Sequence, residues 1–160
     1  MKLYHGSQAI VREPRIITPN RTLDYGAGFY TTTSFEQARD WIRRKINSEQ
    51  RQGYVNIYDY DETSAEALSI LRFEEPNEDW VDFVHDNRTV PGFTHPYDIV
   101  FGPVANDRVY AAFALYEQGF IDKLSLIREL KAYKLIDQML FHTDKALKTL
   151  RFIESKEVTL

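Results

Sequence analysis

Three residues on predicted strands have side chains that could take part in ligand binding or catalysis: His5, Tyr30 and Gln138. His5 directly precedes Gly6 at the expected end of the first strand, so the imidazole can face a cleft while the glycine backbone approaches a ligand closely. Tyr30 follows the glycine-rich run 26–28, and its aromatic face suits a planar cation. Gln138 can accept a hydrogen bond, but a neutral amide cannot act as a base. These residue types fit a planar ligand.

Each of these residues also has a purely structural interpretation. His5 and Gly6 can be a strand followed by a turn. Tyr30 can belong to the hydrophobic core, and Gln138 can be an ordinary polar residue of a strand. His142 is more readily explained as structural than as catalytic.

Three arginines lie in a segment with turn-forming composition. Residues 8–25 contain Pro and Asn and are predicted to form a loop with one short strand at 15–17. Arg12, Arg15 and Arg21 fall within it. Each of them could meet a ligand phosphate, because a guanidinium group binds phosphate in bidentate fashion. A solvated surface charge explains each of them too.

Most familiar catalytic motifs are absent from the sequence. It has no Gly-x-Ser-x-Gly and no phosphate-binding loop. Gly26-x-Gly28 lacks a third glycine. It also precedes a predicted strand, whereas the glycine motif of a dinucleotide-binding site follows one. The lack of cysteine excludes disulfides, thiolate metal sites and a cysteine nucleophile. His85 and His95 lack the spacing of helical metal ligands, so no metal is expected.

Length and composition predict one globular domain over residues 1–160. The chain is 43% hydrophobic and 28% charged, as in ordinary soluble proteins. Its net charge of -4 gives no general attraction to nucleic acid or anionic membranes. No apolar run approaches the roughly 18 residues of a membrane span, so no membrane association is expected. A cytoplasmic origin is the default expectation, although secretion without a cleaved signal would leave the same sequence.

Strands and helices are predicted in an irregular order, which indicates the α+β class. The glycines at 26–28 lead into a strand containing Phe29 and Tyr30, whose side chains point to opposite faces. Ser34 and Gln37 form a capping box for the helix that follows. The other strands are expected at 2–5, 54–60, 67–73, 97–102 and 135–142. Helices are expected at 35–46, 78–88, 107–118, 122–131 and 144–153, the third capped by Asn106 and the last by Thr143.

Three segments resemble the motifs of the ADP-ribosyltransferase superfamily, in the branch with a His-Tyr-Glu type triad. Leu3-Tyr4-His5-Gly6-Ser7 is similar to the first motif, and Gly28-Phe29-Tyr30-Thr31-Thr32 to the second. The segment 137–143 resembles the third, which sits on a late strand. The whole chain, including residues 20–30 and 141–147, looks like the bacterial DUF3990 group of ADP-ribosyltransferase-like toxin domains.

This resemblance implies a split β-sheet core with flanking helices and NAD as co-substrate. It implies that the Gly6 backbone binds the nicotinamide carboxamide, that His5 contacts the adenosine-side ribose, and that Tyr30 stacks on the nicotinamide ring. The expected catalytic residues are His5, Tyr30 and Gln138. The expected NAD-binding residues are His5, Gly6, Ser7, Arg21, Gly28, Phe29 and Tyr30.

Gln138 departs from the pattern of that family, which usually has Glu at this place. Breaking the glycosidic bond forms an oxocarbenium-like centre, so an acceptor near the ribose hydroxyl is needed. The Gln138 amide can orient that hydroxyl. Activation of the attacking group must then come from the substrate, from Asp137 or from a carboxylate that the sequence does not identify. Alternation along a strand points Asp137 and Gln138 to opposite faces.

The leading hypothesis is an NAD-dependent mono-ADP-ribosyltransferase that modifies a macromolecule of unknown type. The resemblance further implies a bacterial toxin or effector with a cognate antitoxin or immunity protein. A non-catalytic NAD- or ADP-ribose-binding module is an alternative, which Gln138 favours. A plain interaction domain is another. Transfer and simple NAD hydrolysis both remain open.

Overall fold

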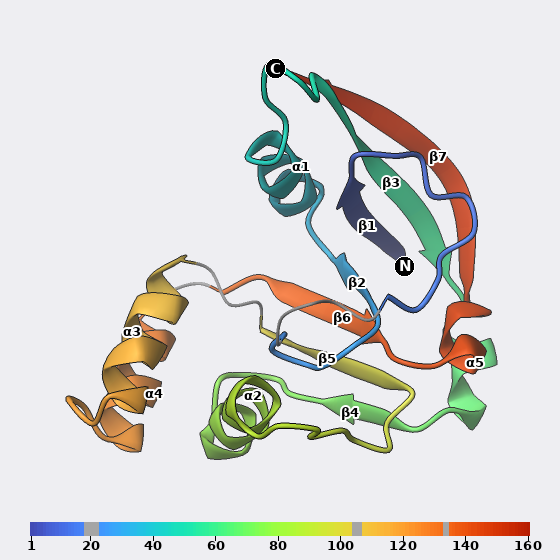
Figure 1. The fold of residues 1–160 in the computed structure, drawn as a ribbon. Helices are drawn as coiled ribbons and strands as arrows, with labels where there is room; N and C mark the ends of the chain where they lie inside the picture. The colour runs from blue at the N-terminus through green and yellow to red at the C-terminus, as the bar shows by residue number, and fades with distance from the viewer. Residues whose placement is uncertain (18–22, 104–106, 133–134) are drawn as a thin grey trace.

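The computed structural model describes residues 1–17, 23–103, 107–132 and 135–160, which form a mixed α+β structure around a seven-stranded sheet (Figure 1). The strands are β1 (Lys2–Ser7), β2 (Phe29–Thr32), β3 (Gln52–Tyr60), β4 (Ile70–Arg72), β5 (Ile99–Pro103), β6 (Asp137–Phe141) and β7 (Leu150–Thr159). Their order in the sheet is β4-β5-β6-β2-β1-β3-β7. The β4–β5 pair is parallel and the other pairs are antiparallel.

The helices are α1 (Phe35–Arg43), a 3-10 turn η1 (Ser64–Ala67), α2 (Glu78–Thr89), α3 (Asp107–Glu117), α4 (Lys123–Lys131) and α5 (Asp144–Leu147). Side chains cap the N-termini of α1, α2, α4 and α5. The Ser34 hydroxyl accepts a hydrogen bond from the Gln37 amide, so the predicted cap is confirmed. Asn77, Asp122 and Thr143 cap α2, α4 and α5 in the same way. The Ser34 amide donates to Thr32 Oγ1, which takes the place of the second hydrogen bond of the predicted capping box. The predicted cap at Asn106 lies outside the described residues.

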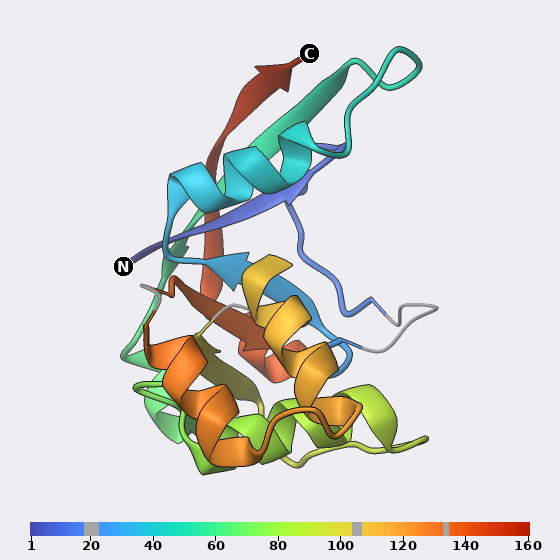
Figure 2. The same cartoon turned by 90° about the vertical axis from the view of Figure 1, so that its left-hand side faces the viewer.

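Helices α1 to α4 cover one face of the sheet, which Figure 2 shows from the helix side. One hydrophobic cluster joins α1 to β3 through Ala38, Ile42, Ile46, Val55 and Ile57. A second joins the helices α2, α3 and α4 to β5 and β6, through residues that include Trp80, Phe113, Leu126, Val100 and Leu140. In the sheet, β2 lies between β6, which α2, α3 and α4 cover, and β3, which α1 covers. The helical layer therefore consists of two parts that meet near β2.

The opposite face of the sheet carries a third cluster. Leu3, Phe29, Tyr58, Met139 and Phe141 form its centre, and Ala65 of η1 and Ala146 of α5 pack against it. Burial on both faces explains why β5 and β6 consist almost wholly of buried residues. No helix within the described ranges is long and apolar enough to cross a membrane.

The predicted class and most predicted elements are confirmed, but the C-terminal prediction is wrong. The helix expected at 144–153 ends after Leu147, and Leu150–Thr159 is strand β7. Leu150 and Phe152 lie two residues apart and both pack against the third cluster, which is the period of a strand. Pairing with β3 along the sheet edge therefore overrides the helical pattern.

Three further predictions need correction. Residues 15–17 form no strand. The strand expected at 67–73 is replaced by the 3-10 turn η1 followed by the short β4, which pairs with β5. The first strand does not end before Gly6, because Gly6 and Ser7 remain paired with Val55 and Tyr54 of β3. Gly6 is thus a residue inside a strand and not a turn.

Replacement of Gly6 by alanine tests the packing of α1. A Cβ at Gly6 would lie 2.6 Å from the carbonyl oxygen of Ala38, so the helix would have to move. Overpacking of this kind typically costs about 1–3 kcal/mol. We expect Gly6→Ala to lower the free energy of unfolding in urea by about that amount, and the neighbouring control Ser7→Ala to change it by less than about 0.5 kcal/mol. Equal stability of both variants would contradict the close approach.

Candidate functional site

The seam between β1 and β2 is the place where the sheet is least regular. β1 pairs with β3 along its whole length, whereas its ladder with β2 has the single pair Tyr4–Thr32. Beyond that pair the His5 Nδ1 donates a hydrogen bond to the Tyr30 carbonyl oxygen (2.6 Å). A side chain thus takes the place of a backbone partner, and the two strands separate where two of the predicted motifs meet.

Gly6 directs its backbone toward this seam. The His5 carbonyl points to β3, where it accepts a hydrogen bond from the Asn56 side chain (3.3 Å). Alternate residues of an antiparallel strand direct their backbone groups to opposite neighbours. The N–H and C=O of Gly6 therefore face β2, where the β1–β2 ladder has stopped. One donor and one acceptor at this point suit a ligand carboxamide.

The surroundings of His5 determine the protonation state and the tautomer of its imidazole ring. Its ring lies 4.2 Å from the Phe29 ring at an angle of 32°. Burial lowers the pKa of His5, and the hydrogen bond to Tyr30 opposes that shift. The imidazole is therefore neutral near pH 7, with its proton on Nδ1. Nε2 remains as an acceptor for a hydroxyl group.

The registers distribute the predicted catalytic residues over both faces of the sheet. Thr32 lies opposite both Tyr4 and Gln138, so these residues share a face, and strand alternation adds Gly6 and Tyr30 to it. His5 and Phe29 belong to the other face, apart from the contact of His5 with the Tyr30 backbone. Phe29 is 2% exposed and is a core residue. The structure thus groups Gly6, Tyr30 and Gln138, with His5 in the seam beside them.

The loop that leads into β2 is fixed by side chains. Three consecutive carbonyl groups each accept one hydrogen bond: Tyr25 O from His95 Nε2 (2.9 Å), Gly26 O from the Tyr30 hydroxyl (2.6 Å) and Ala27 O from His142 Nδ1 (2.6 Å). We call these three interactions the carbonyl clamp. Gly26 makes this path possible because its φ of 84° lies in the left-handed region.

Tyr30 is a member of this clamp as well as a candidate ligand contact. Its hydroxyl also accepts a hydrogen bond from the Tyr25 amide (3.1 Å). Burial raises the pKa of Tyr30, the Tyr25 amide opposes the shift, and the charge of Asp24 adds to it. The hydroxyl is therefore engaged, so any contact with a ligand must use the face of the ring.

The two histidines of the clamp stack on each other. The ring centroids of His95 and His142 are 4.2 Å apart. His95 Nδ1 accepts a hydrogen bond from the Tyr97 amide (3.3 Å), so His95 is neutral when Nε2 binds the loop. Burial lowers the pKa of His95, and a charge on His142 lowers it further. His142 has the structural role that its position predicts.

Gln138 is buried and incompletely bonded. The residue is 6% exposed, and its Nε2 is buried without a hydrogen-bond partner in the described structure. It lies opposite Thr32 on β2 and opposite Gly102 on β5. The Tyr25 hydroxyl sits over Gly102, where a Cβ would come within 2.6 Å of it. The Tyr25 hydroxyl is therefore the neighbour of this amide, which opposes the rise that burial causes in the pKa of Tyr25.

Two further residues near the site were not identified from the sequence. Trp41 is 42% exposed, and its ring would be 3.3 Å from a Cβ on Gly6. Asp24 is 7% exposed and accepts a weak hydrogen bond from the Tyr110 hydroxyl (3.5 Å). Neither has a sequence signal, because the packing of α1 on Gly6 and the path of the loop determine their positions.

The remaining predicted residues have varied surroundings. The Ser7 hydroxyl accepts a hydrogen bond from the Ala9 amide (3.2 Å). Gly28 lies against the Phe141 carbonyl, so it allows β2 to begin beside β6. Burial raises the pKa of Asp137, and the charge of Glu74 adds to this shift. Arg21 lies outside the described residues.

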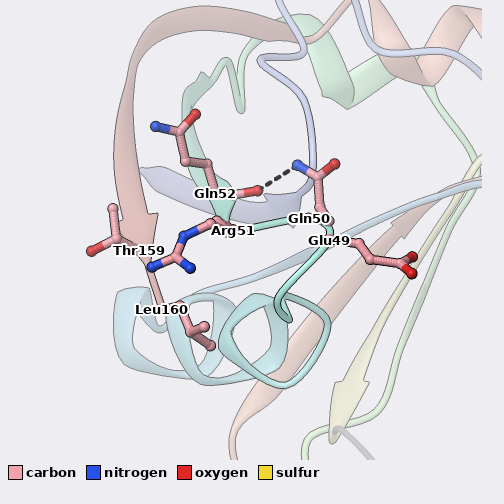
Figure 3. Close-up of a pocket in the computed structure, with 6 residues that line it drawn as sticks. All are labelled: Glu49, Gln50, Arg51, Gln52, Thr159 and Leu160. Atoms are coloured by element: carbon pink, nitrogen blue, oxygen red, sulfur yellow. Dashed lines mark hydrogen bonds between the residues drawn. The ribbon is translucent and has the colours of Figure 1, made fainter.

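Two surface pockets lie away from these residues. One, of about 590 Å³, is lined by Glu49, Gln50, Arg51, Gln52, Thr159 and Leu160 (Figure 3). The other adjoins Met1 and Asp59. Neither includes His5, Tyr30 or Gln138, and we assign no function to them. In the described part of the chain, no three His, Asp or Glu side chains come together as metal ligands do.

The buried histidines predict acid sensitivity. Because the pKa values of His5 and His95 are lowered by burial, the unfolded chain binds protons first as the pH falls below about 6.5, and the folded state loses stability. Each histidine contributes at most about 1.4 kcal/mol per pH unit. We expect urea unfolding to show falling stability between pH 7.5 and 5.5, with a smaller slope in His95→Gln. A flat profile for the unmodified protein would refute this.

Comparison with known proteins identifies a family for the chain. No curated protein matches the chain significantly. The family model described as "Protein of unknown function (DUF3990)" matches residues 1–152, a span that contains β1, β2 and β6 and hence His5, Gly6, Tyr30 and Gln138. The chain therefore belongs to the DUF3990 family.

Proposed function

We propose that the protein is an NAD-dependent mono-ADP-ribosyltransferase acting on a macromolecular target. The observation that carries the proposal is the adjacency of β1, β2 and β6. The three segments that resemble superfamily motifs are far apart in the sequence, yet Tyr4, Thr32 and Gln138 lie in one row across these strands. The separation of β1 from β2 beyond that row supports a split-sheet core of the same kind.

The groups around the seam match the parts of NAD. The backbone of Gly6 offers a donor and an acceptor for the nicotinamide carboxamide. Tyr30 and the exposed Trp41 offer aromatic faces for the cationic nicotinamide ring, an interaction worth about 0.5–2 kcal/mol. The neutral His5 offers an acceptor for a ribose hydroxyl.

The chemical step would consist of the heterolytic cleavage of the bond between nicotinamide and ribose. The bonding electrons leave with nicotinamide, and a nucleophile of the target captures the oxocarbenium-like ribose and loses its proton. Gln138 can orient a ribose hydroxyl but cannot take up that proton. Asp137 lies on the other face of β6 from Gln138, so we place the base on the target or on another carboxylate.

The biological setting of the proposal rests on the family resemblance alone. It comprises a bacterial toxin or effector acting in the cytoplasm, with a cognate antitoxin or immunity protein. The nature of the target, and the choice between transfer and hydrolysis, would follow from the products that the protein forms.

Gln138 also supports a second candidate function, a binding module for NAD or ADP-ribose without turnover. A glutamine at the position where the superfamily usually has glutamate keeps the ligand contact and removes the carboxylate. The two candidates differ in a simple way, because both bind NAD and only the enzyme releases nicotinamide.

Labelling with NAD separates these candidates. We expect the protein, incubated with bacterial lysate and isotopically labelled NAD, to release nicotinamide and to attach ADP-ribose to a component visible by mass spectrometry. Trp41→Ala should weaken NAD binding by about tenfold, as expected for loss of an aromatic contact. Phe120→Ala is the matched control, since Phe120 is an exposed aromatic residue (73%) outside the site.

Three results would decide the outcome. NAD binding without nicotinamide release would favour the binding module. Thermal stability unchanged at millimolar NAD would contradict both candidates, because a ligand of the folded state raises stability by mass action. Equal weakening by Trp41→Ala and Phe120→Ala would remove Trp41 from the site.

A further inference from the structure

The two edge strands of the sheet differ in length. At one edge lies β4, which has three residues, and at the other lies β7, which has ten. Figure 1 shows β7 along the outer margin of the molecule. β7 contains no proline or glycine, and no strand of the described residues pairs with its outer side. The unpaired backbone groups of such an edge can bind another strand.

The hydrogen bonds to β3 show which residues of β7 direct their backbone groups to the free side. The Leu160 amide donates to the Arg51 carbonyl (3.2 Å), so residue 160 faces β3. Alternate residues of an antiparallel strand direct both backbone groups to opposite sides. The even-numbered residues 154–158 therefore bond to β3, whereas the odd-numbered residues 155–159 present N–H and C=O groups to the outside. Ser155 lies nearest the middle of β7.

Two opposite charges flank Ser155 on one face of β7. Glu154 and Lys156 lie opposite Ile57 and Val55 of β3, two residues of the cluster that packs against α1. The Glu154 and Lys156 side chains are 54% and 57% exposed, and their charged atoms lie 4.0 Å apart. In an antiparallel strand the same two charges follow in the opposite order. The segment 154–156 is therefore complementary in charge to a second copy of itself.

We propose that the free edge of β7 binds β7 of a second copy of this chain, antiparallel and with the two Ser155 residues on the twofold axis. In this register each Glu154 lies opposite Lys156 of the other copy, and the two Ser155 residues exchange a pair of backbone hydrogen bonds. A shift of the axis by one residue would bring together either two Glu154 or two Lys156 side chains, which is unfavourable. The charges thus select one register.

This interface is small and lies away from the candidate site. Ile153 has no partner in the register with β3, so a bulge bends β7 there and limits regular pairing to the residues that follow. An interface of this size belongs to the weak, transient class. In the sheet, β3 and β1 separate β7 from the seam beside β2. The inference is therefore independent of the proposed function.

Charged side chains on an edge strand can also have the opposite role, which is to keep other strands away. In that case the protein is a monomer, and the order of the two charges has no consequence. Self-pairing instead requires that each charge meet its opposite across the axis. Reversal of single charges separates the two possibilities.

The first experiment measures the dimer dissociation constant by analytical ultracentrifugation at low ionic strength. The unmodified protein should form a reversible, concentration-dependent dimer. Glu154→Lys and Lys156→Glu should each weaken it by about tenfold or more, because both charge pairs become repulsive. Glu66→Lys is the matched control, since Glu66 is an exposed residue of η1 outside β7 and the substitution changes the net charge as Glu154→Lys does. A protein that remains monomeric up to about 1 mM would overturn the inference.

Mixing the two variants tests the register. Glu154→Lys has two positive charges on the edge and Lys156→Glu has two negative charges, so an equimolar mixture should form a mixed dimer while each variant alone is monomeric. The double variant, in which the two charges are exchanged, should dimerise like the unmodified protein. No association in the mixture would overturn the inference. NAD binding should be equal in all of these proteins, and its absence from all of them would contradict the proposed function alone.

A change at Ser155 tests the backbone pairing. Ser155→Pro removes an N–H group that points away from β3, so the ladder with β3 stays intact while the pair of hydrogen bonds at the axis is lost. Ser155→Ala keeps that N–H group and is the control. Ser155→Pro should be monomeric and Ser155→Ala dimeric, with thermal unfolding showing that both are folded. Equal dimer dissociation constants for the two folded variants would overturn the proposed pairing.

Discussion

The carbonyl clamp on residues 25–27 is the constraint on which the site depends. Where a loop leads into a strand that lies between two other strands, the last carbonyl groups of the loop are outside the hydrogen-bond pairing of the sheet. Buried carbonyl groups need hydrogen-bond partners. His95, Tyr30 and His142 supply them. They come from the segment before β5, from β2 itself and from the end of β6, so the clamp holds the loop before β2 on the β6 side of the seam. It fixes the position of Tyr30 through the hydroxyl group of that residue.

The same constraint explains why the chemistry of the site resides in neutral groups. Burial lowers the pKa values of His5 and His95 and raises those of Tyr25 and Tyr30, so all four groups are uncharged near neutral pH. Neutral groups of this kind can interact with a cationic nicotinamide ring through aromatic faces and hydrogen bonds. Of the carboxylates nearby, Asp137 lies on the opposite face of its strand from Gln138.

Sequence reasoning predicted the elements better than their contacts. Periodicity and caps located α1, α2 and α4 to within a few residues, since these signals are local. The strand β7 was missed because its identity comes from pairing with β3, which is a property of the whole sheet. Gly6 and Gln138 were proposed as site residues from residue type and motif resemblance, but their surroundings were not predicted. That Gly6 makes room for α1, and that Trp41 is exposed beside it, depends on helix packing that no local pattern encodes.

The position of Gln138 joins the fold to its proposed use. On an open strand, a glutamine would satisfy its amide with water, and the choice between donor and acceptor would have no consequence. Here the sheet neighbours Thr32 and Gly102 bury it, and the hydroxyl of Tyr25, already bound to Pro103 and Trp80, cannot donate to it. The side-chain amide of Gln138 therefore has one favoured orientation. A glutamate at this place would meet the same lone pair of Tyr25 with a negative charge, so the Tyr25–Trp80 pair and the amide at 138 form one compatible set.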